Sequence, residues 1–484
     1  MKTFYISTAI PYVNGAPHIG HALEFVQADV VARYRRQQGD NVFFLTGTDD
    51  NALKNVQAAV AAGVSVDSWV NQHADVFKVL VKKLDISNTD FIRTSIDTRH
   101  LRGAQKLWQS CQDEDIYKKK YKGLYCLGCE EFKSANELIN GECSEHPGKK
   151  VEVIEEENYF FRLSKYQKQL DELISTDALK IVPETRKNEA LSFIRGGLED
   201  FSISRSRERA QSWGIEVPND SSQMMYVWFD TLSNYINALG YADEAELFHH
   251  FWKTSHERIH IIGKGINRFH TIYWPAMLLS AKVRLPSKIF IHGYLTINNQ
   301  KISKTLGNVI DPFEVIDRFG VDATRYYLLR EIPAYDDGDF SYEKLSERYD
   351  SDLANGLGNF AARVSTLGEK IGTFSMAESL ISDEIKNIIA QTQKSVSVHL
   401  DLFLFHEALL SIWSLISFGD KYVNEKQPWK TQDHAVITNL LFILYSVSEL
   451  LIPFLPATAE KIKNVFQEEG DLYSIKKLIL FPRR

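Results

Sequence analysis

The sequence has little cysteine, no excess of positive charge and no long apolar run. Only four of its 484 residues are cysteine, too few for a disulfide-built secreted domain. The net charge of −7 argues against a general polyanion binder, but it leaves room for a local basic stripe that binds RNA by shape and through unstacked bases. We find no apolar stretch of the roughly 18–20 residues that cross a bilayer, so we expect no membrane association.

Other features that the sequence lacks further restrict the class of protein to which it can belong. The N-terminus runs directly into an apolar segment without a signal-peptide core, and we find neither a repeat nor a low-complexity tail. Hydrophobic residues make up 44% and charged residues 25% of the chain, which is ordinary for globular proteins. A chain of this length exceeds one core, so we predict about two to four domains. From the missing membrane span and signal-peptide core we predict a cytoplasmic protein.

The most informative segment is residues 18–21, with the sequence His-Ile-Gly-His. It follows an apolar run and a turn-rich stretch, and it opens an amphipathic pattern over residues 19–38, which predicts strand, loop and helix. A helix start attracts phosphate through its N–H groups and dipole. The spacing of His18 and His21 places both on one face, and Gly20 leaves room for a ligand.

A second segment, residues 301–305, reads Lys-Ile-Ser-Lys-Thr and lies in a predicted loop that ends near Gly307. Each segment alone carries little weight, because a His-x-x-His pair usually packs and a Lys-Ser-Lys loop is usually solvated. Their joint occurrence, in this order and after a leading strand, favours a site for a nucleoside triphosphate.

The two segments resemble the HIGH and KMSKS motifs of class I aminoacyl-tRNA synthetases. Their surroundings resemble the methionyl-tRNA synthetase family at residues 9–15, 292–295 and 306–312, and the resemblance extends nearly end to end. It implies ATP-dependent activation of methionine to methionyl-adenylate, with release of pyrophosphate, followed by transfer to the 3′ end of tRNA(Met). The alternative is a catalytically silent synthetase-like tRNA-binding protein, which the two intact motifs disfavour.

The resemblance gives the motif residues catalytic roles. His18 and His21 would donate hydrogen bonds to phosphate oxygens, and Lys301 and Lys304 would follow the charge as pyrophosphate leaves. Mg²⁺ is expected with the ATP. The expected ATP-binding set also contains Gly20, Gly293 and Ser303.

Methionine recognition requires an apolar, polarizable pocket and a counter-charge for the α-amine. By resemblance Asp49 holds the amine, and it follows a predicted strand at residues 41–46, where open α/β sheets bind ligands. From the residues alone, core packing is favoured for Trp228 and Tyr235, because residues 226–229 read as a buried strand. The residues that match the family's methionine site are Ile10, Tyr12, Asp49, Arg205, Trp228, Tyr235 and His270.

Three of the four cysteines are clustered. Cys126 and Cys129 form one close pair, and Cys143 and His146 form another, which suits a tetrahedral zinc ion with three thiolates and one imidazole. Because protein fills all four positions, we predict one structural zinc per chain. Cys111 stands apart and is expected to be an ordinary buried thiol.

The order of strand-like and helix-like runs predicts an α/β fold: a doubly wound Rossmann-like catalytic domain with a zinc-knuckle insertion, followed by an all-α helical bundle. The predicted parts are the first catalytic half (1–115), the connective insertion (116–204), the second catalytic half (205–290), the KMSKS-type loop and linker subdomain (291–344) and the α-helical anticodon-binding domain (345–484).

Anticodon reading would fall to the helical domain. Asn359 and Arg363 are four residues apart on one predicted helical face, and Trp429 could stack an unpaired base. All three match the positions with which the family reads the CAU anticodon. Unaided, the sequence favours surface polar residues and a core tryptophan.

Several positions depart from the family's pattern. The second motif has Ile302 and Thr305, both conservative changes, and Asp-Asn-Ala at residues 50–52 replaces the frequent Glu-His-Gly. Gly265 stands where many relatives have an Asp that contacts ribose, and Thr231 stands where Ala is common beside the amino-acid pocket. ATP affinity and side-chain selectivity are the properties that these changes affect. Some relatives have a C-terminal dimerising β-barrel that this chain lacks, so we expect a monomer.

Overall fold

The computed structural model describes residues 1–126, 131–133, 138–143, 151–298, 300–301 and 308–482. The chain divides into two compact units, which are treated separately. The sheet unit contains residues Met1–Pro17, Gly39–Leu80 and Asn88–Ile291, and the helical unit contains His18–Gln38, Val81–Ser87 and His292–Arg484.

The sheet unit is built on a six-stranded sheet of order β3-β2-β1-β14-β15-β9. Its pairs β1–β2, β2–β3, β1–β14 and β9–β15 are parallel. The inner strands are almost continuously buried, as expected for a parallel sheet covered on both faces. The α/β Rossmann-like prediction is confirmed. The strands are β1 (Thr3–Thr8), β2 (Asn41–Thr48), β3 (Asp90–Arg93), β9 (Lys180–Val182), β14 (Glu257–Gly263) and β15 (Lys288–His292).

Helices connect these strands. They are α2 (Leu53–Ala62), α3 (Val66–Lys83), α4 (Thr98–Ser110), α5 (Gln167–Ser175), α6 (Glu184–Arg195), α7 (Val227–Leu232), α8 (Asn234–Asn237), α9 (Glu246–Phe248) and α10 (Trp274–Ser280). The predicted strand at residues 226–229 is wrong, because strand β13 (Asp220–Met225) ends before it and Tyr226 caps α7. A short apolar run does not distinguish a buried strand from a buried helix.

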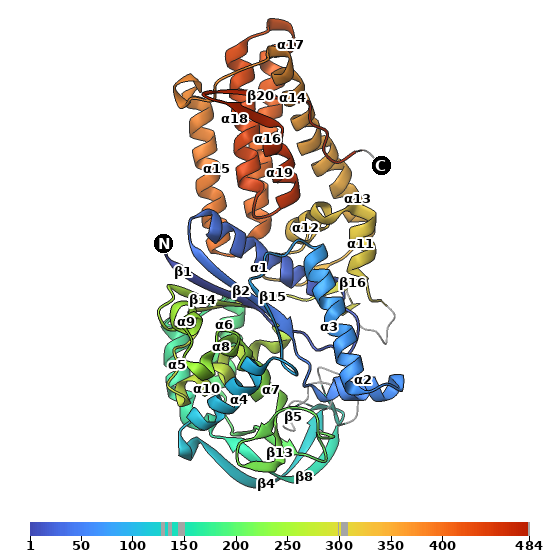
Figure 1. Cartoon of the computed structure of the whole chain (residues 1–484), viewed down its shortest axis with the longest axis vertical. Coiled ribbons are helices and arrows are strands. Elements are labelled where there is room, and N and C mark those ends of the chain that lie inside the picture. Colours follow the sequence, from blue (N-terminus) through green and yellow to red (C-terminus); the bar gives the residue numbers. More distant parts are fainter. Residues whose placement is uncertain (127–130, 134–137, 144–150, 299, 302–307, 483–484) are drawn as a thin grey trace. The chain divides into compact units, whose positions relative to one another are not determined.

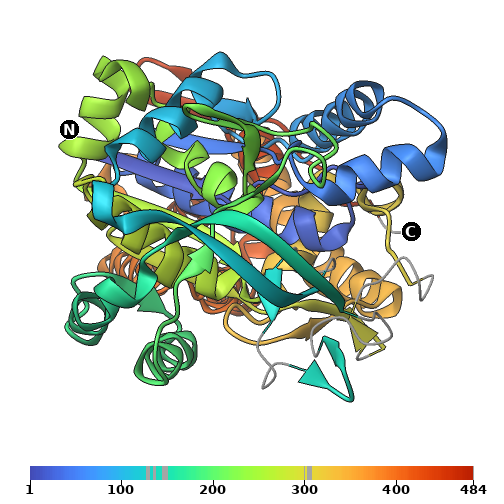
Figure 2. The same cartoon turned by 90° about the horizontal axis from the view of Figure 1, so that it is seen from below.

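The first part of the predicted insertion is a long antiparallel ribbon, whereas its later part contains α5, α6 and β9, a strand of the main sheet. β4 (Ile116–Cys126) pairs with β8 (Glu152–Phe161) along nearly their full lengths, and Figure 2 shows the two strands crossing the view together. The smaller strands of this region are β5 (Glu131–Lys133), β6 (Leu138–Ile139), β7 (Glu142–Cys143), β10 (Phe201–Ser202), β11 (Ser204–Ser206) and β12 (Glu216–Val217). Strand β13 joins β11 and β12 in a separate three-stranded sheet.

The helical unit contains a bundle in which α14, α15, α16 and α18 run side by side (Figure 1). A π-helical segment, Tyr349–Gly358, leads directly into α14. The helices are α1 (Ile19–Gln37), α11 (Pro312–Phe319), α12 (Val321–Arg330), α13 (Tyr342–Arg348), α14 (Asn359–Ile371), α15 (Asp383–Asp401), α16 (Phe405–Lys426), α17 (Pro428–Thr431), α18 (His434–Leu451) and α19 (Pro456–Asn464).

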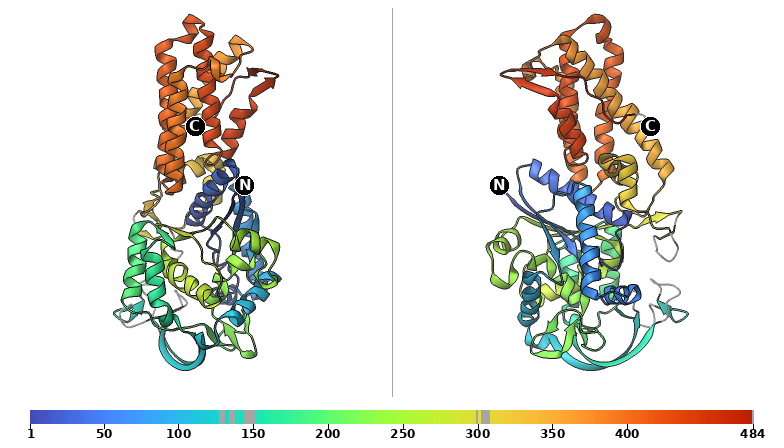
Figure 3. Two further views of the ribbon diagram at one scale, coloured as in Figure 1. Left: turned by 90° about the vertical axis from the view of Figure 1, so that its left-hand side faces the viewer. Right: turned by 45° about the vertical axis from the view of Figure 1, so that its right-hand side comes forward.

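The helical unit also contains strands. β16 (Leu295–Ile297) pairs with β17 (Gln300–Lys301) and β18 (Gly338–Asp339). After the last helix, β19 (Phe466–Glu469) and β20 (Leu472–Ile475) form a hairpin beside the bundle (Figure 3). The prediction of a purely α-helical C-terminal region is therefore wrong at its end, where two short strands pair across a tight turn.

α18 combines 18 residues with a mean hydropathy of 1.5, the length and composition of a membrane span. The expectation that no such segment exists is therefore wrong. Sixty-seven percent of α18 is buried inside the protein, where it contacts α14, α15 and α16. A core helix of a bundle is apolar for this reason.

A buried ion pair fixes α1 within the helical unit. Asp29 on α1 lies 2.8 Å from a guanidinium nitrogen of Arg325 on α12, and both side chains are fully buried. Burial alone would raise the pKa of Asp29, but Arg325, Arg33 and the hydrogen bonds from Ser87 bring it below its ordinary value. Arg325 also donates to three backbone carbonyls, so its charge is fully paired.

Candidate active site

Two histidines form the N-terminus of α1. His18 is the N-cap residue, and its Nδ1 accepts a hydrogen bond from the backbone N–H of Gly20 at 3.1 Å. The Nδ1 of His21 accepts from the backbone N–H of His18 at 3.0 Å, so the two side chains cap the helix reciprocally. The rings stack with centroids 3.8 Å apart, which confirms that both lie on one face.

These capping bonds determine which nitrogen of each ring carries the proton. Because each Nδ1 accepts from an N–H group, the proton of each neutral ring is on Nε2. The Nε2–H of His18 and of His21 is then the group that can donate to a phosphate oxygen at this helix start. Gly20 allows the His18 ring to lie close to the backbone, because a Cβ there would lie 3.0 Å from two atoms of that ring, tighter than an ordinary contact.

His292, the first residue of the C-terminal part of the helical unit, contacts α1. β15 ends at His292, whose Nε2 lies 3.0 Å from a carboxylate oxygen of Glu24 on α1. The next residue, Gly293, passes so close to Asp336 that a Cβ would lie 2.2 Å from its backbone oxygen. Close backbone approach explains the glycine in this segment.

The second motif is described only in part. Lys301 ends β17, where its backbone pairs with Thr296 of β16. The side chain of Lys301, together with Ser303 and Lys304, lies outside the described residues, so their roles stay predictions.

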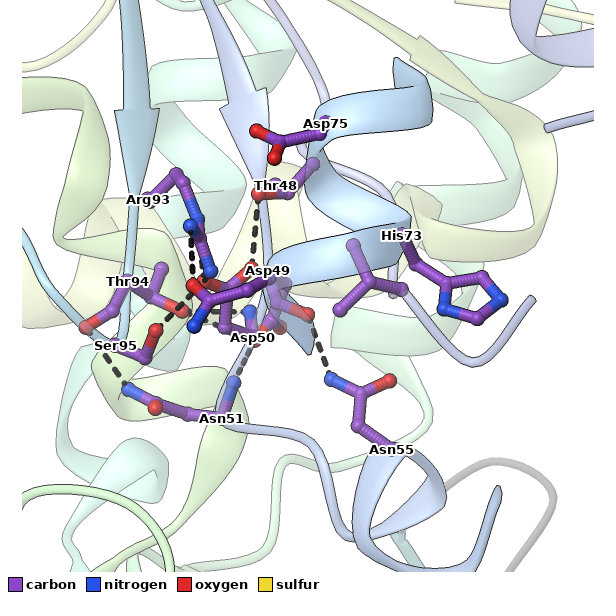
Figure 4. A network of polar contacts seen from close by, with 12 residues as sticks. Thr48, Asp49, Asp50, Asn51, Asn55, His73, Asp75, Arg93, Thr94 and Ser95 are labelled. Atoms are coloured by element: carbon purple, nitrogen blue, oxygen red, sulfur yellow. Dashed lines mark hydrogen bonds and ion pairs between the residues drawn. The ribbon is translucent and has the colours of Figure 1, made fainter. Parts of the chain in front are cut away.

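In the sheet unit, Asp49 follows β2 in a buried loop whose backbone is held on both sides. Its N–H donates to the carbonyl of Pro11 at 2.9 Å, and its carbonyl accepts from the Nδ2 of Asn55 at 2.9 Å. Its carboxylate Oδ1 accepts from the backbone N–H of Asn51 at 3.0 Å (Figure 4). Its Oδ2 accepts from the hydroxyl of Thr231 at 2.5 Å. The carboxylate is therefore both buried and oriented.

The neighbouring carboxylate has a different role. Asp50 accepts hydrogen bonds from Arg93 at 2.9 Å, Ser95 at 2.7 Å and Thr48 at 2.8 Å (Figure 4). Burial raises the pKa of Asp50 although the Arg93 guanidinium opposes that rise. Asp50 therefore braces the loop through Arg93.

An aromatic group lies next to this loop. Trp228 on α7 stacks on Phe269 with ring centroids 3.8 Å apart. Tyr12 and His270 approach Trp228 edge-on, with centroids at 6.2 and 6.4 Å. Tyr12 also forms an isolated β-bridge with Asp49. The structure therefore brings the predicted amine partner and the predicted pocket aromatics together.

His270 is held in its neutral form. Its Nδ1 donates to the carbonyl of Ile266 at 3.0 Å, so its Nε2 accepts from the hydroxyl of Tyr235 at 2.7 Å. Burial lowers the pKa of His270 to about 4, although the bond to Ile266 opposes that fall. An uncharged ring beside Trp228 suits an apolar, polarizable ligand such as a thioether.

This buried histidine predicts a loss of stability in acid. Between pH 6.5 and about 4 the unfolded chain binds a proton on His270 that the folded chain excludes. The free energy of unfolding should therefore fall as the pH drops through this window, by up to about 3 kcal/mol from this group. Urea unfolding at pH 7 and pH 4.5 measures it, and a His270→Gln variant should lose less stability over the same interval. An equal loss in both proteins would contradict the prediction.

The two remaining pocket candidates are also buried. Ile10 belongs to the same core cluster as Trp228 and Tyr235. Arg205 on β11 is 4% exposed, and its Nε and Nη1 have no hydrogen-bond partner within the described part of the chain. A buried guanidinium with unused donors suits an anionic group.

Three residues around the site were not predicted. Phe269 lies within an apolar run, where nothing distinguishes a ligand-pocket aromatic from a core residue. Glu24 lies three positions after His21, and this helical spacing was the available signal. Thr231 was noted only as a departure, and its contact with Asp49 requires the folded structure.

The predicted zinc ligands are described in part. Cys126 ends β4 and Cys143 ends β7, and both side chains are buried. Cys129 and His146 lie outside the described residues. Within the described ranges no group of three or more potential metal ligands comes together, so the zinc site stays a prediction. Cys111 is buried and forms no disulfide, as predicted, and burial raises the pKa of its thiol to about 12.

The predicted anticodon residues gather at one end of α14 in the helical unit. The guanidinium of Arg363 lies 5.9 Å from the ring centre of Trp429, which is 46% exposed. Arg363 donates to Asp420 at 3.1 Å and to Asn424 at 2.6 Å. Asn359 is exposed, so the group presents polar and aromatic surface rather than core.

Comparison with known proteins agrees with this geometry. Residues 4–147 and 133–365 match the family described as tRNA synthetases class I (M). The chain is 42% identical to a methionine–tRNA ligase of Caldanaerobacter subterraneus subsp. tengcongensis, covering 100% of this chain and 79% of that relative. It is 38% identical to one of Brucella suis, with coverages of 99% and 95%.

A solved structure gives the same result. Mycobacterium tuberculosis methionyl-tRNA synthetase in complex with methionyl-adenylate superposes with a TM-score of 0.90 at 37% identity, covering 100% of this chain and 99% of that one. The chain therefore belongs to the class I tRNA synthetases of the M type.

Proposed function

We propose that the chain is a methionine–tRNA ligase. A carboxylate oxygen of methionine attacks the α-phosphorus of ATP, the bond to the β-phosphate breaks, and pyrophosphate leaves. A ribose hydroxyl at the 3′ end of tRNA(Met) then attacks the adenylate carbonyl, and AMP leaves. The observation that carries the proposal is the stacked pair of His18 and His21, whose Nε2–H groups mark the start of α1 as a phosphate site.

In the first step negative charge moves onto the departing pyrophosphate. The Nε2–H groups of His18 and His21 would stabilise it by donating to phosphate oxygens. Lys301 and Lys304 match the family's mobile cations and would follow the leaving group. Mg²⁺ would arrive as part of the ATP substrate.

The methionine would be bound through its α-ammonium group and through its side chain. Asp49 would provide the negative charge for the α-ammonium, and the packed rings of Trp228, Phe269 and Tyr12 would provide the apolar surface for the thioether. Neutral His270 keeps a second charge out of that space. A carboxylate beside uncharged aromatics favours an amino acid with an apolar side chain.

The deciding experiment is ATP–pyrophosphate exchange, with each of the twenty amino acids tested separately. Exchange that depends on methionine alone is expected. Folded, zinc-replete protein that exchanges with no amino acid would instead favour the catalytically silent alternative, with Gly265 and Asn51 as the first positions to revert.

We further propose one structural zinc per chain, held by Cys126, Cys129, Cys143 and His146. It would supply folding energy to the insertion and no chemistry to the reaction. Freshly purified protein is expected to contain about one zinc per chain. Cys126→Ser is expected to lower the zinc content and the melting temperature, whereas Cys111→Ser should leave the zinc content unchanged. Substoichiometric zinc in freshly purified wild type would contradict the proposal.

We propose that Asn359, Arg363 and Trp429 read the CAU anticodon. Base stacking on an exposed aromatic ring contributes roughly 1–3 kcal/mol, so Trp429→Ala should slow tRNA(Met) charging about tenfold to a hundredfold. Methionine-dependent exchange should stay within about twofold, because the pocket is untouched. Leu472→Ala, also at an exposed apolar residue of the helical unit, is the matched control. Wild-type charging by Trp429→Ala would exclude the anticodon role.

The remaining expectations, a monomer and a cytoplasmic location, also stay proposals. The low cysteine content supports a reducing compartment. Sedimentation of the purified protein would test the monomer.

A further inference from the structure

Thr231 makes a contact that the sequence does not reveal. It lies on α7, is 5% exposed, and its hydroxyl is 2.5 Å from Oδ2 of Asp49. Because an ionised carboxylate has no proton to give, the hydroxyl is the donor. The other oxygen, Oδ1, accepts from the backbone N–H of Asn51 at 3.0 Å. Oδ1 also accepts from the hydroxyl of Thr94 at 3.5 Å, so donors on both oxygens fix the rotation of the carboxylate.

The position of Thr231 is itself determined by its neighbours. The Nδ2 of Asn51 donates to Oδ2 of Asp230 on α7 at 2.8 Å. The other oxygen of Asp230 lies 2.5 Å from Nε2 of buried His100, and Asn234 donates to the carbonyl of Thr231 at 2.6 Å. Two adjacent residues of α7, Asp230 and Thr231, therefore hydrogen-bond to the loop that contains Asp49 and Asn51. These contacts fix the position of the Thr231 hydroxyl.

Two of the departures from the family's pattern lie at this contact. Thr231 donates to Asp49 through its hydroxyl. Asn51 donates to Asp49 through its backbone N–H, which any residue except proline supplies, and its side chain donates to Asp230 on the facing helix. A carboxylate that is already oriented loses less conformational freedom when the ligand binds.

We propose that Thr231 is a positioning residue that orients the Asp49 carboxylate toward the α-ammonium of the amino acid. The inference rests on the proposed function and adds to it a determinant of amino-acid affinity. It predicts an effect that is specific to the amine end of the ligand.

Two substitutions separate the hydroxyl from the shape of the residue. Thr231→Val keeps the volume and removes the donor, and it should raise the KM for methionine in exchange about tenfold, as expected for the loss of a hydrogen bond to a charged group. The kcat and the KM for ATP should stay within about twofold, since neither phosphate contact changes. Thr231→Ser keeps the donor and should restore the KM to within about threefold of wild type.

Two competitive inhibitors test the amine directly. L-Methioninol keeps the amine, and its Ki should rise about tenfold in Thr231→Val. 4-(Methylthio)butanoate lacks the amine, and its Ki should not change. An equal rise for both inhibitors, or no change for either, would overturn the inference. A wild type without methionine-dependent exchange would overturn the proposed function and this inference with it, so the two failures are distinguishable.

Discussion

Replacement of Asp49 by Asn is expected to lower kcat/KM for methionine in ATP–pyrophosphate exchange by about two to three orders of magnitude. The carboxylate is fully buried, so the α-ammonium of the ligand would enter a site with no counter-charge and little water to replace it. Most of the loss should lie in the KM for methionine. The KM for ATP should stay close to that of wild type.

The fold should tolerate Asp49→Asn. The amide oxygen can still accept from the backbone N–H of Asn51, and the amide nitrogen can donate to the hydroxyl of Thr231, which then becomes the acceptor. The loss of activity therefore reports on the ligand and not on unfolding, which an unchanged melting temperature would verify.

Asp220→Asn is the matched control for this charge removal. Asp220 also lies in the sheet unit, and Lys118, at 2.7 Å, lowers its pKa to about 2. Its substitution should leave kcat/KM for methionine within about twofold, because it contacts none of the pocket residues. If Asp49→Asn retained activity within threefold of wild type, the amine would have another partner.

Local sequence signals predicted the helix start and the parallel sheet. His18 and Gly20 lie in one turn, and their contacts depend on neighbours only two or three positions away. β1 and β14 each contain a short stretch rich in apolar residues, and both strands are buried almost throughout, as parallel strands covered on both faces are. Such signals require no knowledge of distant segments.

The contacts that complete the pocket could not be predicted in this way. Asp49 and Thr231 are 182 positions apart, and their approach depends on how α7 follows β13. That helix was itself misread as a strand, because Trp228 and its neighbours form a short run without a measurable period. The grouping of α1 with the C-terminal helices could not be predicted for the same reason, because the Asp29–Arg325 ion pair joins segments that are far apart in the sequence.

Replacement of His21 by Asn should lower kcat of exchange by about two to three orders of magnitude, the usual cost of one lost donor to a developing negative charge. The substitution separates the two functions of the ring. Its amide oxygen can take the place of Nδ1 and still accept from the backbone N–H of His18, so the helix cap is kept. The Nε2–H donor is lost, and nothing in an Asn side chain reaches that position.

His18→Asn applies the same separation to the partner ring, because Asn is among the best N-cap residues. The two rings stack on one another, so the double variant should lose less than the product of the single losses if both donors act on one phosphate. His434→Asn, at an exposed histidine that begins α18, is the control and should leave kcat within about twofold. Unchanged melting temperature and unchanged methionine affinity, together with a reduced kcat, would place both histidines on the phosphate side of the reaction. A wild-type kcat in both single variants would show that the rings only cap the helix, and the phosphate contacts would then fall to the second motif.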